Sequence, residues 1–324
     1  MRPLKLLALS LLAAATLAGA TGLAPAPTAD AASTMAARTP SAPPLPLLWK
    51  VSDADNAVYL LGSFHLLRES DYPVSADIEA ALAGSARVVF EITPEQLKDP
   101  ATAQKFMTAA SYGDERPLDS VLPADLRDKL DALLVPRGGS ATQLDDYKPW
   151  FVNLTLVLGL SQSLGFSPEL GLDHYLMERA ASAGKVTGGL ESVDAQLQAL
   201  DGSPVSEQIA GLADFLDRPQ DMPAMLDDMH LAWRRGDIER LEALTGADMR
   251  ENTPQTYRRV VVDRNDAWTP KLRAMLDGAD TTDTLVVVGA LHLLGDDGVV
   301  EKLRAQGYSI ERICSACSAV TAPR

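Results

Sequence analysis

Short apolar runs bounded by polar turn residues stand near both ends of the chain, and this pattern is typical of β-strands. Near the N-terminal end, "LWKVS" and "AVYLLG" predict a hairpin with its turn over 53–56, and "ARVVFEI" predicts a third strand. Near the C-terminal end, "DTLVVVGA" and "YSIERI" predict two more strands. Ser75 can cap a helix between the second and third strands, so we expect a strand–helix–strand unit with a parallel pair.

The middle of the chain carries apolar residues at helical spacing. Helices are predicted over the ranges 123–135, 149–166, 171–184, 206–217, 222–237 and 254–276. One short strand, "KVTGGLES", interrupts them. We therefore expect an α/β fold, in which a mixed, largely parallel sheet is formed from both ends of the chain with a helical insertion in the middle.

Residues 1–31 differ in composition from the rest of the chain. Arg2 and Lys5 precede a short apolar run, and small-x-small sites follow at 18–20 and 29–31. This order is typical of a secretory signal peptide, and the alternative is an uncleaved N-terminal anchor. Residues 32–46 are rich in Pro and Ala and predict a flexible lead-in. We expect residues 47–324 to form one domain of a periplasmic or secreted protein, with no transmembrane segment in the mature chain.

Charge and cysteine content narrow the set of partners. The formal net charge is −15, which argues against a nucleic-acid partner or an anionic membrane surface held by general electrostatics. The chain has two cysteines, Cys314 and Cys317, and no histidine stands near them to complete a zinc site. In an oxidising compartment we expect these two cysteines to form a local disulfide.

Two of the four histidines, His65 and His292, each follow by three positions a glycine that ends an apolar run. A glycine there lets the backbone turn sharply and approach a ligand closely, and ligands bind beyond the carboxyl ends of parallel strands. We expect the turns at Gly62 and Gly289 to bring the two imidazoles together. The alternative is that each is a hydrogen-bonded core histidine. His174 and His230 lie in predicted helices and are interpreted as surface or packing residues.

Two glutamates also follow predicted strands. Glu91 can complete a set of two histidines and one carboxylate that holds a divalent ion such as Mn, Co or Zn and leaves a position open for water. A metal-bound water becomes a nucleophile at neutral pH. Glu191 can act as the base or as a fourth ligand, or it can simply interact with the N-terminus of the helix that follows.

A set of short motifs then extends along the chain: "YLLGSFHLL", "ARVVFEI", "YKPWFVNL", "GLDHYLMERA", "GGLESVDAQL", "RRGD", "DRNDAW" and "VVVGALHLLGDDGVVEKLRAQGY". In this order they resemble the TraB/GumN family, which includes the animal Tiki proteins, and the resemblance extends from about Leu48 to Ile313. It implies a metal-dependent protease that uses two G-x-x-H motifs and a glutamate, which here match His65, His292 and Glu91. Bacterial relatives of the GumN type are usually secreted.

The resemblance also implies a fold similar to that of the erythromycin esterases and of a group of haem-binding bacterial lipoproteins. In the esterases two histidines, a glutamate and an arginine carry out hydrolysis without a metal, and the corresponding arginine here is Arg264. It would stabilise the oxyanion of a tetrahedral intermediate, although without the resemblance it reads as a salt-bridge residue on a helix. One departure is that Gly62 stands where the esterases have a glutamate.

The function predicted from the sequence is therefore a metal-dependent hydrolase, of the peptidase type, acting on a peptide or small-molecule substrate. A haem- or metal-binding protein without turnover is the first alternative. An accessory protein of exopolysaccharide production is the second, suggested by the family name, but aromatic residues make up only 5% of the chain and form no cluster suited to sugar stacking. The sequence does not indicate an oligomeric state.

Overall fold

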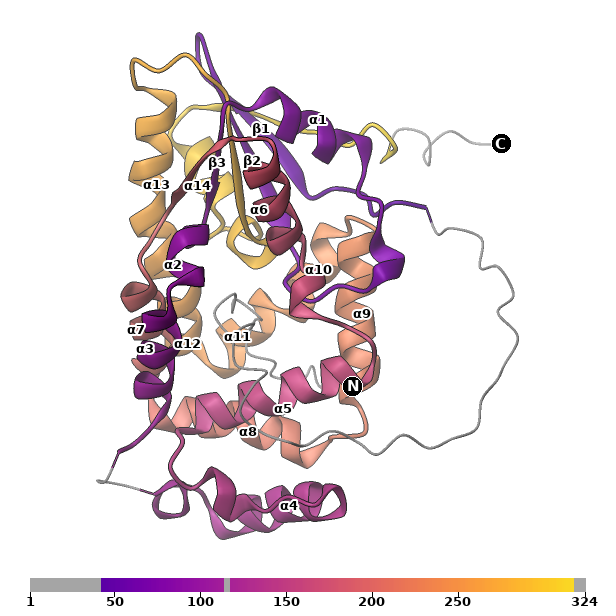
Figure 1. Cartoon of the computed structure of the whole chain (residues 1–324), viewed down its shortest axis with the longest axis vertical. Coiled ribbons are helices and arrows are strands. Elements are labelled where there is room, and N and C mark those ends of the chain that lie inside the picture. Colours follow the sequence, from indigo (N-terminus) through magenta and orange to yellow (C-terminus); the bar gives the residue numbers. More distant parts are fainter. Residues whose placement is uncertain (1–41, 114–116, 318–324) are drawn as a thin grey trace.

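The computed structural model describes residues 42–113 and 117–317, and Figure 1 shows their arrangement. The signal peptide predicted for 1–31 lies outside the described residues. Within them, one sheet has the strand order β4-β3-β5-β2-β1-β6. The strands are β1 (Leu48–Ser52), β2 (Ala57–Ser63), β3 (Arg87–Phe90), β4 (Val186–Gly189), β5 (Thr284–Gly289) and β6 (Ser309–Arg312).

The sheet is mixed and largely parallel, as predicted. Strands β4, β3, β5 and β2 run parallel, while β1 is antiparallel to both β2 and β6. The predicted direct pairing within the strand–helix–strand unit is wrong, because β5 lies between β2 and β3 and pairs with both. Every residue of β5 is buried. A fully buried, largely apolar strand of this kind is stabilised at the centre of a sheet, where both faces are covered.

Helices surround the sheet and extend below it in the view of Figure 1. Those before β4 are α1 (Ala76–Gly84), α2 (Pro94–Lys98), α3 (Pro100–Ala110), α4 (Ala124–Leu134), α5 (Pro149–Ser163) and α6 (Leu172–Ser182). Those after it are α7 (Val193–Asp201), α8 (Val205–Asp217), α9 (Met222–Arg234), α10 (Ile238–Leu244), α11 (Gly246–Asn252), α12 (Pro254–Tyr257), α13 (Asp263–Leu276) and α14 (Val299–Ala305). Ser75 caps α1 as predicted, since its Oγ accepts from the Ile78 N–H at 3.4 Å.

The single helix predicted for 254–276 is interrupted. A π-helical turn, Arg258–Val262, separates α12 from α13. A π turn adds a residue to the helical repeat and rotates the side chains that follow, and such turns are frequent at functional sites. After this turn Arg264, Asn265 and Trp268 are buried, while Asp266 is exposed. The inward face of α13 is therefore unusually polar.

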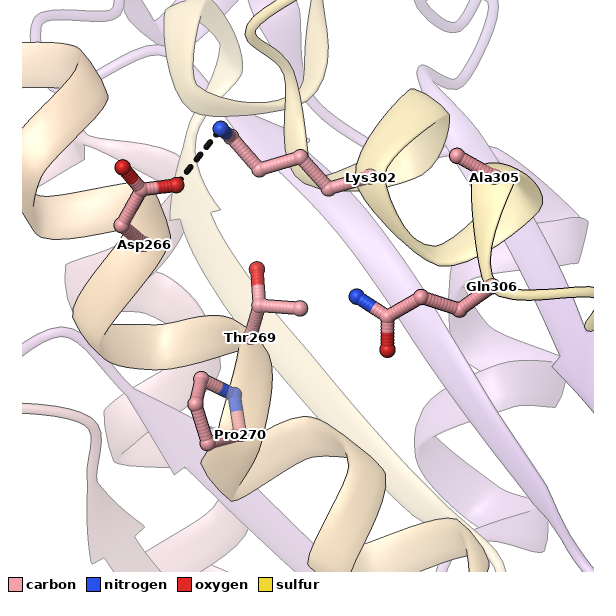
Figure 2. A pocket seen from close by; sticks show the side chains of 6 residues that line it. All are labelled: Asp266, Thr269, Pro270, Lys302, Ala305 and Gln306. Atoms are coloured by element: carbon pink, nitrogen blue, oxygen red, sulfur yellow. Dashed lines mark hydrogen bonds and ion pairs between the residues drawn. The ribbon is translucent and has the colours of Figure 1, made fainter.

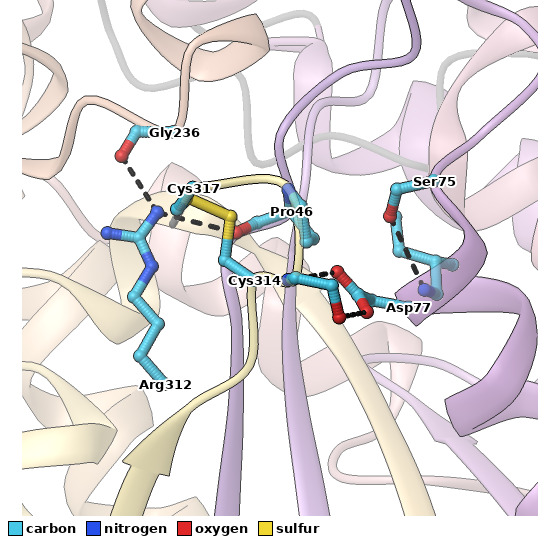
Figure 3. Close-up of a disulfide and its surroundings, with 9 residues drawn as sticks. Pro46, Ser75, Asp77, Gly236, Arg312, Cys314 and Cys317 are labelled. Atoms are coloured by element: carbon cyan, nitrogen blue, oxygen red, sulfur yellow. Dashed lines mark hydrogen bonds between the residues drawn. A yellow bond between two sulfur atoms is a disulfide. The ribbon is translucent and has the colours of Figure 1, made fainter. Parts of the chain in front are cut away.

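The C-terminal cysteines are paired, which confirms the predicted disulfide. Cys314 and Cys317 have their Cα atoms 5.3 Å apart, just beyond β6 (Figure 3). Ser315, between them, donates from its backbone N–H to Asp77 at the start of α1, at 2.8 Å. The lead-in predicted for 32–46 is described only from residue 42, and there the Leu45 N–H already donates to the Arg234 carbonyl of α9 at 2.8 Å. None of the described helices is long and apolar enough to cross a bilayer.

Candidate active site

Four residues selected from the sequence follow the carboxyl ends of four adjacent parallel strands. Along the sheet, Glu191 follows β4, Glu91 follows β3, His292 follows β5 and His65 follows β2. The side chains of Glu91, His65 and His292 are at most 7% exposed, and that of Glu191 is also 7% exposed. The strand order thus gathers residues from distant parts of the sequence at one buried edge of the sheet.

Arg264 of α13 connects three of these four residues. Its Nη2 donates to Glu91 Oε2 and to Glu191 Oε1, both at 2.6 Å, and its Nε donates to Glu191 at 3.1 Å. Its Nη1 donates to His292 Nε2 at 3.0 Å and to the Val260 carbonyl, within the π turn, at 3.2 Å. A guanidinium has five N–H bonds, and all five are directed at these acceptors.

The two glutamates around Arg264 differ in their protonation behaviour. Burial raises the pKa of Glu91, but the Arg264 charge, the nearby His292 and His65, and the Gly289 N–H, which donates at 2.7 Å, together outweigh it and lower the pKa to about 2. For Glu191, burial raises the pKa, and the nearby Arg264 offsets this only in part. The ionised form of Glu91 is therefore strongly favoured, while Glu191 is the easier of the two to protonate.

His292 is held as a neutral imidazole. Asn265 Nδ2 donates to the carbonyls of His292 and Asp297 at 3.1 and 2.9 Å, so its Oδ1 is oriented to accept from His292 Nδ1 at 2.8 Å. Nε2 is then the unprotonated nitrogen and accepts from Arg264. Complete burial, together with the adjacent Arg264 charge, lowers the pKa of His292 to about 3.

His65 has a different environment, although its motif is the same. Its Nδ1 lies 3.0 Å from Oδ1 of the buried Asp173 on α6, and an ionised carboxylate can only accept. Burial lowers the pKa of His65, but the Asp173 charge and hydrogen bond outweigh it, so the pKa is raised from 6.5. Its Nε2 is buried and has no hydrogen-bond partner among the described residues. His65 is thus the histidine of the pair that can exchange a proton.

The glycines of the two motifs provide space rather than an unusual backbone conformation. Neither Gly62 nor Gly289 has a positive φ, so the expected sharp glycine turn is not what these positions require. A Cβ on Gly289 would lie 2.9 Å from His65 Nε2 and 3.3 Å from Glu91 Oε1. A Cβ on Gly62 would lie 3.1 Å from the Cα of Ala290. Gly289 therefore lets two site residues pack directly against the β5 backbone.

The predicted metal ligands do not fit an ion in this arrangement. His292 Nε2 accepts from Arg264, and Glu91 Oε2 accepts from both Arg264 and Gln196. Of the two histidines, only His65 has a ring nitrogen without a hydrogen-bond partner among the described residues. Among the described residues, no group of three or more His, Cys, Asp or Glu side chains is placed to hold a metal ion. The guanidinium of Arg264 lies among the groups that would have to converge on the ion.

Four residues that complete the site were not singled out from the sequence: Asp173, Gln196, Asn265 and Trp268. Trp268 Nε1 donates to Glu191 Oε2 at 3.1 Å, and Gln196 Nε2 donates to Glu91 Oε2 at 3.1 Å. A signal for the polar residues was present. Asp173 and Gln196 interrupt the apolar stripes of their helices, and a polar residue on a buried stripe needs a partner in the core.

The remaining histidines belong to other parts of the structure. His230 on α9 is buried and its Nε2 lies 2.9 Å from the carboxylate oxygens of Asp71. It packs edge-on against Phe166, with ring centroids 5.0 Å apart. His174, next to Asp173 on α6, is partly buried. The interpretation of His230 as a packing residue fits this environment.

A pocket of about 370 Å³ lies on the outer side of α13, facing α14 (Figure 2). Its lining residues are Asp266, Thr269, Pro270, Lys302, Ala305 and Gln306. Asp266 Oδ1 accepts from Lys302 Nζ at 2.6 Å across this pocket. None of the residues gathered around Arg264 lines it.

A known protein family and two named proteins are similar to this chain. A model of the TraB/PrgY/gumN family matches residues 47–312. The uncharacterized protein YbaP of Escherichia coli (strain K12) is 29% identical over 160 residues, which cover 48% of this chain and 56% of YbaP. The metalloprotease TIKI2 of Danio rerio is 23% identical over 302 residues, which cover 78% of this chain and 58% of TIKI2. The chain thus spans little more than half the length of either relative, and no solved structure matches it.

Proposed function

The chain belongs to the TraB/PrgY/gumN family, and from this premise and the buried cluster around Arg264 we propose that it is a hydrolase in which His65 is the general base. The observation that carries the proposal is the pair formed by His65 and Asp173. Nδ1 is fixed by a buried carboxylate at 3.0 Å, and Nε2 has no partner among the described residues. A base oriented by a third group is the arrangement that activates nucleophiles in many hydrolases.

In the proposed reaction His65 Nε2 removes a proton from water while the water oxygen attacks the substrate carbonyl carbon. Asp173 keeps the imidazole in the orientation that leaves Nε2 open and stabilises the imidazolium that forms. The same proton then passes to the leaving group as the scissile bond breaks. The reaction consumes one water and needs no other reactant. The burial of His65 keeps bulk water away from the proton-transfer step.

The role proposed for Arg264 is to hold Glu91, Glu191 and His292 in place beside His65. It forms ion pairs with Glu91 and Glu191 and donates to His292, so its N–H bonds are already used within the protein. The oxyanion role inferred from the resemblance would require a substrate oxygen to replace one of these acceptors. His292, with its pKa of about 3, accepts from Arg264 rather than acting as a second base.

A metal-dependent peptidase is the second candidate, because the distant relative TIKI2 is named a metalloprotease. The predicted ligands are His65, Glu91 and His292, with Mn, Co or Zn as the ion. In the arrangement described above Arg264 contacts two of them, and it would have to leave His292 before that set could close on an ion.

Substrate and location are part of the proposal. We propose a peptide or small-molecule substrate with a hydrolysable acyl bond, and export to the periplasm or the medium under the signal peptide predicted for residues 1–31. The net charge of −15 supports a partner other than nucleic acid. The N-terminal mass of protein recovered from the cell envelope tests export, and an intact Met1 on cytoplasmic protein would refute it.

The experiment that tests the function is a hydrolysis screen on the purified mature chain. A library of peptides, esters and amides is incubated with the wild type, with His65→Ala and with His174→Ala. General-base catalysis contributes about 10²- to 10⁴-fold, so His65→Ala should lose at least 100-fold in kcat while His174→Ala retains the wild-type rate. Equal rates for the two variants on every cleaved substrate would reject His65 as the base.

A further inference from the structure

Two buried polar atoms near the end of β2 lack a hydrogen-bond partner among the described residues: Ser63 Oγ and His65 Nε2. Ser63 is 2% exposed and His65 is 7% exposed, so bulk water does not satisfy them. Leaving a buried hydroxyl or imidazole nitrogen without a partner costs free energy, and such atoms are normally bonded to protein or to an ordered water. Two of them within three residues indicate a common ligand.

The strand register places these atoms beside the same point. Ser63 pairs with Gly289 across the parallel β2–β5 ladder. Paired residues of parallel strands project from the same face of a sheet, and the strands are about 4.8 Å apart. A Cβ on Gly289 would lie 2.9 Å from His65 Nε2 and 3.3 Å from Glu91 Oε1. The Ser63 side chain therefore stands next to the position at which these two atoms converge.

We propose that Ser63 Oγ and His65 Nε2 together bind the water that attacks the substrate, which makes Ser63 a catalytic residue. This inference rests on the proposed function for its chemistry but not for its geometry. Neither atom has a hydrogen-bond partner in the described part of the chain, so they are not bonded to each other, and Ser63 is not poised as a nucleophile activated by His65. One water between them satisfies both atoms.

The hydrogen bonds of this water can be assigned in full. His65 Nδ1 is used toward Asp173, so Nε2 of the neutral ring accepts one hydrogen of the water. The Ser63 hydroxyl donates to the water oxygen. Glu91 Oε1 accepts from the Gly289 N–H and has a lone pair left for the second hydrogen. Three partners are typical of a buried water.

In the reaction, the bond between the water oxygen and the hydrogen facing His65 breaks, and that proton moves to Nε2. The water oxygen forms a bond to the substrate carbonyl carbon, whose π electrons move onto the carbonyl oxygen. Nε2 then returns the proton to the leaving group as its bond to carbon breaks. Ser63 stays chemically unchanged and directs an oxygen lone pair of the water toward the substrate.

The test uses Ser63→Ala, Ser63→Thr and the control Ser161→Ala in the full mature chain. Ser161 is another buried serine, but its Oγ donates to the Val157 carbonyl at 2.7 Å. We expect Ser63→Ala to lower kcat about 10- to 100-fold with KM unchanged, Ser63→Thr to restore most of the rate, and Ser161→Ala to have no effect on it. An unchanged kcat for Ser63→Ala would overturn the inference and leave the hydrolase proposal standing.

A second readout does not depend on activity. High-resolution crystal structures of the wild type and Ser63→Ala should show a water between Ser63 Oγ and His65 Nε2 in the first and not in the second. If the wild type instead has a direct Oγ–Nε2 bond, or if substrate leaves an acyl group on Ser63 in mass spectra, the inference is wrong and Ser63 is the nucleophile. A bound water in a protein that hydrolyses nothing would refute the hydrolase proposal alone.

Discussion

Arg264 Nη1 donates to His292 Nε2 at 3.0 Å, so the histidine of the second G-x-x-H motif is hydrogen-bonded to an arginine. The histidine of the first motif, His65, is hydrogen-bonded to Asp173 through Nδ1. Two G-x-x-H motifs that look alike in the sequence therefore place their histidines in opposite electrostatic environments. Burial beside a cation lowers the pKa of His292 to about 3, whereas a buried carboxylate raises that of His65.

Replacing Arg264 with methionine should destabilise the protein and abolish activity. The substitution keeps an unbranched, apolar stem but removes the guanidinium, which leaves Glu91 and Glu191 buried without their shared cation. Breaking a buried pair in this way typically costs about 3–5 kcal/mol. The free energy of unfolding in urea at neutral pH measures the effect. Arg273→Ala on the same helix is the control, since Arg273 is half-exposed and should change stability by no more than about 0.5 kcal/mol.

The free energy of unfolding that is lost with Arg264 should depend on the charge of Glu191. Burial already raises the pKa of Glu191, so the neutral form is the easier one to keep buried. The double variant Arg264→Met, Glu191→Gln should therefore recover part of the stability lost by Arg264→Met alone. If the double variant is less stable by the full sum of the two single effects, Arg264 and Glu191 do not interact and the network described here is wrong.

His292 should make the protein less stable in acid. Its folded-state pKa is about 3, below the ordinary 6.5, so between these values the unfolded chain binds a proton that the folded chain does not. Stability therefore rises with pH in this window and is lost as pH falls from about 6.5 toward 3. Glu91 acts in the same direction at lower pH, since its contribution is lost between its ordinary 4.5 and about 2.

Urea unfolding of the wild type and His292→Gln at pH 7, 6, 5 and 4 tests this contribution. A glutamine oxygen can still accept from Arg264 but does not titrate. We expect the wild type to lose more stability than the variant between pH 7 and pH 4. The difference between their free energies of unfolding should therefore narrow or change sign. A difference in the free energy of unfolding that stays constant with pH would mean that the pKa of His292 is not depressed in the folded state.

The sequence predicted most of the frame and the location of the site, for identifiable reasons. Apolar runs ending in Gly62 and Gly289 mark strand ends, and parallel strand ends converge. The position of β5 between β2 and β3 was not predictable in the same way, because periodicity shows that a strand exists but not which strands flank it. The π turn before Arg264 was also missed, since its residues, "RRVVV", have no turn signal and fit a continuous helix.

The partners of the site residues were harder to predict than the residues themselves. Asp173 lies 108 positions from His65 in sequence, and only the packing of α6 against the sheet brings them together. In the same way Asn265 fixes the tautomer of His292 from a helix that precedes its strand. The sequence identified Arg264 only through a family resemblance, and its contacts with both glutamates and with His292 depend on the three-dimensional arrangement.

Asp173→Asn should shift the pH profile of hydrolysis. The Asp173 charge is what outweighs burial and raises the pKa of His65, so removing it should lower that pKa. A general base works in its neutral form, so the acidic limb of kcat/KM should move to lower pH, while the maximal rate falls by about 100-fold or more.

The chain offers a matched control for Asp173, because a second buried aspartate, Asp71, pairs with His230. Asp71→Asn should lower the free energy of unfolding but leave the acidic limb of the profile where it is. If both variants move the limb, or if neither does, Asp173 supports the structure and not the titration of His65.

Variants of Arg264 can decide whether the protein needs a bound metal ion. The wild type treated with EDTA should keep its activity and thermal stability, because Arg264 contacts both His292 and Glu91, and of the two site histidines only His65 has a nitrogen without a partner among the described residues. Removing the guanidinium frees His292 Nε2 and leaves Gln196 as the remaining side-chain donor to Glu91 Oε2. Arg264→Met should therefore bind Co²⁺ or Zn²⁺ more tightly than the wild type, measured by calorimetry, although it is inactive. His292→Ala added to that variant should abolish the gain in metal affinity.

The opposite result, a stoichiometric ion in the wild type that both His65→Ala and His292→Ala lose, would show that Arg264 withdraws when the ion binds. In that case the metal-dependent peptidase becomes the correct assignment.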